Sequence, residues 1–312
     1  MSEGTAMKMA TSTVCEPSTR QTSQLPVSEV DRSRHIVFWT LWYASSALFV
    51  LSILLAMYSG VWEYSTRRYL KGFSDAIIPE EAAPEQKVEA IVNWMAHGPE
   101  RQQELLPQNG PDRDPTDTLN YASLLQVCGT ATNAFVNLAD SAGIPARRLL
   151  LLNSQRMAKH VVAEAWINGR WIVVDPAFRT ILHGANGALL TRDELTNPLV
   201  FAAATRNIRG YDPTYTFDRT AHLRASRLPV IGSFGRRALS AVVPSWDESA
   251  FLSLLLERKS LEALAAALVL VFFFGMLRLG LRWYGERRFG VRATRIRHQV
   301  RRAIAALLDT AG

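Results

Sequence analysis

Residues 160–175 have the sequence HVVAEAWINGRWIVVD. Two runs rich in β-branched and aromatic side chains flank Asn168-Gly169. This pair predicts a two-residue type I′ turn, because both central residues of that turn need positive φ. Pro176 ends the second run, since proline cannot donate to a β-ladder. The segment is therefore predicted to be a tight β-hairpin, in which His160 and Asp175, at the two open ends, should be neighbours.

Residues 128–145 have the sequence CGTATNAFVNLADSAGIP, which predicts a helix that begins at Cys128. Apolar side chains recur at helical spacing, Gly143 suits the position just after the helix, and Pro145 prevents the helix from resuming. A cysteine at a helix N-terminus faces backbone N–H groups and the positive end of the helix dipole, which favour the thiolate. The same N–H groups of Cys128 and its neighbours are predicted to hold an oxyanion.

Cys128, His160 and Asp175 thus form a candidate triad of thiol nucleophile, base and orienter. Each residue has another explanation. Cys128 could be a small buried hydrophobic residue, His160 a hydrogen-bonded histidine at a strand end, and Asp175 a turn-former before proline. The order of the three residues and the geometry of the hairpin favour the catalytic interpretation.

Together with Gln126-Val-Cys128-Gly and Gly143-Ile-Pro-Ala-Arg147, these segments resemble the transglutaminase-like superfamily. The resemblance covers roughly residues 80 to 230, because residues 84–94 are also similar to the helix that commonly opens this domain. His160-Val-Val-Ala-Glu resembles a bacterial, membrane-anchored subset of the family.

The resemblance implies an α+β fold with a papain-like core, in which a helix carrying the cysteine packs on an antiparallel sheet carrying the histidine and the aspartate. It implies that Cys128 is the nucleophile, His160 the base and Asp175 the orienter. The calcium-binding loops and additional β domains of animal members have no room in this chain, so calcium dependence and cross-linking activity are not expected. No cofactor is expected either.

Tyr121 and Gln126 precede the candidate nucleophile, where papain-like enzymes often recruit a second oxyanion donor beside the N–H of the cysteine. A polar loop is the alternative for both, and we favour it. Glu164 shares a face of the first strand with His160 by the period of two, so it is expected either to line the cleft or to pair with an arginine such as Arg147. Trp166 is a further candidate for the cleft.

The remaining histidines do not predict a metal site. They lie in expected loops or helix ends without a cysteine or carboxylate at metal-ligand spacing, which makes solvated or hydrogen-bonded roles the expectation for His97, His183 and His222. The sequence also has no glycine-rich phosphate loop.

Two apolar stretches are expected to cross a membrane on either side of the domain. Residues 36–58 contain no charged side chain and are long enough to span the hydrocarbon core as a helix. The second stretch, 261–281, has an uncharged core of 15 residues, 263–277. A buried or interfacial helix is therefore an alternative there. Arg278 can extend its effective length by snorkelling.

The distribution of charge predicts the orientation. Of the formal net charge of +7, residues 1–35 contribute 0, residues 60–260 contribute +1 and residues 261–312 contribute +6. All nine cations of the last segment are arginines that follow the uncharged core 263–277, so the positive-inside rule predicts a cytoplasmic C-terminus. The excess of basic residues therefore indicates the orientation in the membrane and an interaction with anionic lipid, rather than binding of nucleic acid.

The sequence therefore predicts a membrane-anchored thiol enzyme that acts on an amide or ester carbonyl at the cell envelope. Its expected partners are a peptide or another amide- or ester-containing substrate and membrane lipid, with no nucleic acid. The alternative is a non-catalytic scaffold for envelope or polysaccharide assembly. The expected location of Cys128 outside the cytoplasm, where Cys15 cannot pair with it, supports use of its thiol.

The expected organisation is as follows: a disordered cytoplasmic tail at 1–35, a first transmembrane helix at 36–58, an extracytoplasmic domain at 60–250 with its core at 84–230, a second transmembrane helix at 261–281, and a basic cytoplasmic tail at 282–312. Within this plan, 60–82 is a juxtamembrane stretch, Thr191 and Glu194 form a capping box at the start of a short helix, and 205–246 is irregular.

Overall fold

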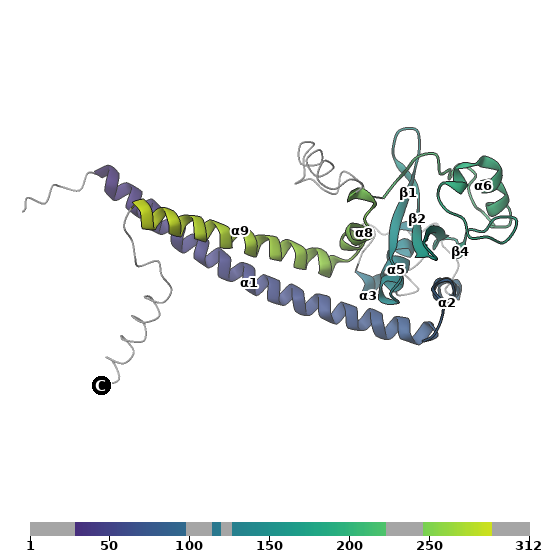
Figure 1. Ribbon diagram of the computed structural model, residues 1–312, viewed down its shortest axis with the longest axis horizontal. Helices are drawn as coiled ribbons and strands as arrows, with labels where there is room; N and C mark the ends of the chain where they lie inside the picture. Colours follow the sequence, from purple (N-terminus) through teal and green to yellow (C-terminus); the bar gives the residue numbers. More distant parts are fainter. Residues whose placement is uncertain (1–28, 98–113, 120–126, 223–245, 289–312) are drawn as a thin grey trace, which may run out of the picture. The chain divides into compact units, whose positions relative to one another are not determined.

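The predicted hairpin lies at the centre of the sheet (Figure 1). β2 (Ala158–Ile167) and β3 (Arg170–Asp175) are antiparallel. Between them Asn168 and Gly169 have φ of +49° and +79°, as the predicted turn requires. The structure is a computed structural model that describes four stretches of the chain: 29–97, 114–119, 127–222 and 246–288.

Three further strands complete a five-stranded antiparallel sheet of order β4-β3-β2-β1-β5. They are β1 (Ala146–Leu152), β4 (Thr180–Ile181) and β5 (Thr220–Ala221). β1 pairs with β2 along its whole length, with a bulge at its end. β5 lies in the segment that was expected to be irregular, so that expectation is wrong for these two residues.

The helices and short 3-10 turns have the following bounds: α1 (Glu29–Ile77), α2 (Pro84–Ala96), α3 (Pro115–Thr118), α5 (Cys128–Ser141), η1 (Glu194–Thr196), α6 (Pro198–Thr205), η3 (Trp246–Glu248), α8 (Ala250–Glu257) and α9 (Lys259–Arg288).

The two faces of the sheet bury separate apolar clusters. Phe135 and Leu138 of α5 are fully buried in a cluster that includes Ala163 of β2 and apolar residues of α2. Val162 belongs to the other cluster, together with Phe201 of α6. Because neighbouring residues of a strand point to opposite faces, α5 and α6 cover opposite sides of β2. The predicted α+β fold, a helix carrying the cysteine on an antiparallel sheet, is confirmed.

Among the described residues, two helices are long and apolar enough to cross a membrane by length and composition, namely 34–77 of α1 and all of α9. They contain both stretches expected from the sequence. The described residues divide into two compact units, one made of 29–45 with 278–288 and the other made of those between 46 and 277. Within the first unit, the guanidinium of Arg278 lies 5.1 Å from the ring centre of Trp42.

The helical boundaries correct two expectations. α1 begins at Glu29, inside the tail that was expected to be disordered, and continues to Ile77 through most of the expected juxtamembrane stretch. Helical hydrogen bonding therefore runs for about 29 Å beyond Tyr58. The sequence did not predict this because 60–77 has no long apolar run, and a helix can continue on backbone bonds and local ion pairs.

The capping box at Thr191 encloses only the short turn η1. Thr191 N–H donates to Glu194 Oε2 at 2.8 Å, and Glu194 N–H donates to the threonine hydroxyl at 3.4 Å. The helix of this region, α6, begins later, after Asn197, whose side-chain oxygen accepts from Leu199 N–H at 3.0 Å. The expected start of the helix was therefore wrong, because Asn197 is the N-cap in use.

A buried arginine joins α1, α5 and the start of α9. Arg258 is 1% exposed and places Nη1 3.2 Å from Glu63 Oε1 of α1. Its Nε donates to Asn137 Oδ1 and its Nη2 to Asp140 Oδ2, both at 2.8 Å. Ser260 donates to the other oxygen of Glu63 at 2.7 Å. A buried charge is costly unless it is paired and hydrogen-bonded, and these bonds meet that condition.

We expect Arg258→Leu to lower the free energy of unfolding by about 2 to 3 kcal/mol, because it leaves the buried carboxylate of Glu63 short of a cation. Arg67 provides a matched control, since it contacts the same Glu63 oxygen at 2.6 Å but its side chain is 62% exposed. Arg67→Leu should cost less than about 1 kcal/mol. Denaturant unfolding of the full chain in detergent measures both, and equal losses would contradict the expectation.

Candidate active site

Cys128 is the first residue of α5, and Val127 is the N-cap. Its sulfur is not part of a disulfide, and the residue is partly exposed. One turn further on, the hydroxyl of Thr132 donates a hydrogen bond to Val161 O at 3.1 Å. Val161 directly follows His160 in β2. This bond fixes the N-terminal turn of the helix against the strand that carries the histidine.

His160 and Asp175 form a buried hydrogen-bonded pair. His160 Nε2 lies 2.7 Å from Asp175 Oδ2, and the two side chains are 1% and 0% exposed. The other carboxylate oxygen accepts from the backbone N–H groups of Ala177 and Phe178 at 3.1 and 3.2 Å. Both oxygens of Asp175 are thus held in place, and Nδ1 is the ring nitrogen of His160 that this bond leaves available.

The electrostatics of the pair favour a charged imidazole. Burial opposes the charged form, but the carboxylate of Asp175 and the neighbouring thiol of Cys128 outweigh it and raise the pKa of His160 to about 9. A protonated imidazole beside a thiol favours the thiolate. The structure therefore places His160 beside both Asp175 and Cys128, the other two residues that the sequence singled out.

Residues 71–176 match the sequence profile of the family described as the Transglutaminase-like superfamily. The chain therefore contains a transglutaminase-like domain, and this is a family of cysteine-based enzymes, in general hydrolases and acyltransferases. The match includes all three residues of the candidate triad. Comparison with curated proteins and comparison with solved structures gave no match.

Glu164 lies in a different cluster from the candidate triad. It is 1% exposed, and its Oε2 is 2.7 Å from Arg147 Nε and 2.8 Å from His222 Nε2. Burial opposes ionisation, but the bonds from His222 and Arg147 outweigh it and lower the pKa of Glu164. Of its two expected roles, the structure shows the pairing with Arg147.

The other predicted site residues are not placed beside the triad by any described contact. Trp166 is 41% exposed and packs against Trp171 across the hairpin, with ring centres 5.1 Å apart. Tyr121 and Gln126 lie outside the described residues. Within the described stretches, no group of three or more His, Cys, Asp or Glu side chains is arranged to hold a metal ion.

Three aromatic residues around His160 were missed by the sequence analysis. Tyr215 stacks on the imidazole, and the rings of Phe178 and Tyr211 meet it edge-on. The Tyr211 hydroxyl lies beside Asp175 without the geometry of a full hydrogen bond, and burial together with that carboxylate raises the pKa of the phenol. The tyrosines follow β3 by about 40 residues, and nothing in their local sequence indicates that the chain returns to the histidine.

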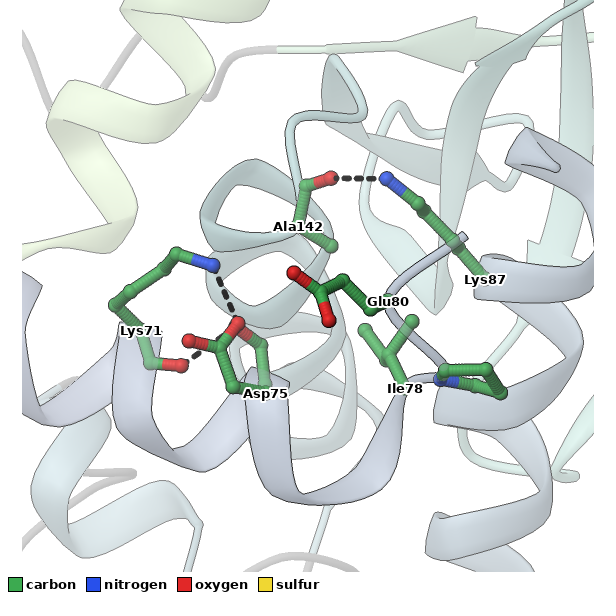
Figure 2. Close-up of a pocket in the computed structure, with 8 residues that line it drawn as sticks. Lys71, Asp75, Ile78, Glu80, Lys87 and Ala142 are labelled. Carbon is green, nitrogen blue, oxygen red and sulfur yellow. Dashed lines mark hydrogen bonds and ion pairs between the residues drawn. The ribbon is translucent and has the colours of Figure 1, made fainter. Parts of the chain in front are cut away.

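A separate polar pocket of about 310 Å³ lies at the other end of α5 (Figure 2). Lys87 donates to Ala142 O at 3.2 Å, and Lys71 pairs with Asp75 on α1. Figure 2 shows the carboxylate of Glu80 between these two pairs. Ala142 follows the last residue of α5, so the length of this helix, about 20 Å, separates the pocket from Cys128. The pocket is therefore not part of the candidate active site.

The raised pKa of His160 predicts a loss of stability at alkaline pH. The pKa is about 9 in the folded chain and 6.5 ordinarily, so the stabilisation is complete below pH 6.5 and is lost as the pH rises through 9. It amounts to roughly 3 kcal/mol. The Cys128→Ser variant removes the titration of the thiol and should still lose most of this stability at alkaline pH. The double variant Cys128→Ser, Asp175→Asn should lose much less stability over the same pH range.

Thermal unfolding of these two variants between pH 6 and pH 10 measures the difference. Parallel curves would show that Asp175 does not hold the proton on His160.

Proposed function

We propose that the domain is a membrane-anchored thiol enzyme that attacks an amide or ester carbonyl at the cell envelope. The observation that carries this proposal is the buried bond of 2.7 Å between His160 and Asp175 beside a cysteine at a helix N-terminus. A histidine with a purely structural role does not require a thiol beside it, and a cysteine with a purely structural role does not require a charged imidazole beside it. The combination is what nucleophilic catalysis requires.

In the proposed reaction the Cys128 thiolate attacks the carbonyl carbon, and the electron pair of the C=O bond moves to the oxygen. Backbone N–H groups of the first turn of α5 stabilise this oxyanion. His160 gives its proton to the leaving amine or alcohol as the tetrahedral intermediate collapses to a thioester. His160 then takes a proton from water, which hydrolyses the thioester, or from an acceptor amine, which receives the acyl group.

Asp175 has the role of orienter in this scheme. Its bond to Nε2 directs Nδ1 toward the thiol and stabilises the imidazolium. Because its second oxygen is held by two backbone N–H groups, the carboxylate cannot rotate away without breaking them.

The proposed location is the outer side of the cytoplasmic membrane, with both termini in the cytoplasm. Two observations support it: the two apolar helices flank the domain in the sequence, and nine arginines follow the uncharged core 263–277 of the second one. The proposed substrate is a peptide or another amide- or ester-containing component of the envelope, and the helices contact membrane lipid.

Labelling with an electrophilic amide probe tests the mechanism. Cys128→Ala and His160→Ala should each abolish nearly all labelling by the probe and nearly all turnover of an amide substrate. The double variant should have no lower activity than either single variant, because the two residues act as a unit. Asp175→Asn should leave the domain folded with a lower rate. Slow labelling of an accessible Cys128 in the unaltered protein would instead favour the non-catalytic scaffold.

Accessibility of single cysteines tests the topology. In a Cys15→Ser, Cys128→Ser background, Ser12→Cys and Thr310→Cys should be protected from a membrane-impermeant maleimide in spheroplasts, whereas Asn186→Cys should react. Labelling of Thr310→Cys together with Asn186→Cys would reduce the anchor to one helix. Labelling of both terminal positions with protection of Asn186→Cys would place the domain in the cytoplasm.

A further inference from the structure

The imidazole of His160 is enclosed by three aromatic rings, two of which come from a distant part of the chain. The ring of Tyr215 is parallel to it, with an interplanar angle of 7° and a distance of 4.4 Å between ring centres. Phe178 approaches at 5.7 Å and 67°, and Tyr211 at 6.2 Å and 83°. Tyr211 also meets Tyr215 edge-on at 5.7 Å. One face of the imidazole is therefore covered by a flat ring that is itself supported from the side.

The backbone around Tyr215 is fixed in position beside the strand of His160. Asp212 accepts from Thr214 N–H at 2.8 Å, and Tyr215 N–H donates to Asp212 O at 3.0 Å. Lys159 Nζ donates to Thr214 Oγ1 at 3.1 Å. Since Lys159 precedes His160 and Thr214 precedes Tyr215, this bond joins the two chain segments directly next to the stacked rings.

A stacked aromatic face has two physical effects on a histidine that works as an acid and a base. It restricts rotation of the imidazole out of the plane in which Nε2 meets Asp175, and it attracts the positive charge of the imidazolium. It also keeps water from one side of the bond between His160 and Asp175, which strengthens that bond. A branched aliphatic side chain of similar size would exclude water without offering a flat, electron-rich face.

We propose that Tyr215 is a positioning residue for His160, which holds the imidazole in plane and favours its protonated form through the stacked ring. This inference rests on the proposed function, since it assigns Tyr215 a role in activating the Cys128 thiol. The hydroxyl group is not needed for this role.

The rate of alkylation of Cys128 by iodoacetamide tests the proposal, measured on the full chain in detergent with Cys15→Ser. At pH 6 the thiolate exists because of the imidazolium, whereas at pH 10 an ordinary thiol is ionised as well. Tyr215→Leu should lower the rate about three- to tenfold at pH 6 and leave it unchanged at pH 10. Tyr215→Phe keeps the ring and should stay within about twofold at both pH values.

Phe217→Leu is the matched control, because Phe217 lies in the same segment and its ring packs against Phe201 and is not one of the three that meet the imidazole. It should weaken packing of the segment without a change at pH 6. An unchanged rate at pH 6 in Tyr215→Leu, or an equal loss in Phe217→Leu, would overturn the role of Tyr215 while the proposed function stands. If Cys128 of the unaltered chain reacts at pH 6 no faster than a model thiol, the proposed function fails and this inference falls with it.

Discussion

The candidate site depends on the turn at Asn168-Gly169. Side chains alternate between the faces of a sheet with a period of two, so a slip of one residue in the hairpin would exchange Val162 and Ala163 between the two buried clusters. The same slip would turn His160 away from Asp175. Two backbone positions with positive φ thus set the register on which both the core and the bond between histidine and carboxylate rely.

The central part of the fold could be predicted because its determinants are local. The turn, the helix that starts at Cys128 and the proximity of His160 to Asp175 all follow from residues a few positions apart or from a tight hairpin. The role of Glu164 could not be decided from the sequence, because the alternation of side chains along a strand gives the face of the sheet on which Glu164 lies but not the residue that pairs with it. His222, which binds it, reaches the same face through β5, a strand of two residues with no detectable pattern.

What the sequence did not predict depends on contacts between distant segments. Tyr215 meets His160 from 55 residues away, and Arg258 meets Glu63 across 195 residues. An arginine before an apolar helix suggests a membrane boundary by composition, whereas the structure makes Arg258 a buried member of a network with α5. Such pairings are decided by the tertiary fold.

The bond between Glu63 and Arg258 has a consequence for how a substrate is found. Glu63 follows the first apolar stretch by five residues, and Arg258 precedes the second by three. Arg258 also bonds to Asn137 and Asp140 of α5. On the proposed topology, these bonds hold α5 near the level where the chain leaves the lipid, with no flexible tether between anchor and helix. An acyl donor that is itself attached to the bilayer would then reach the thiol by lateral diffusion, which is a search in two dimensions. The anchor would not increase the rate at which a soluble donor meets the thiol.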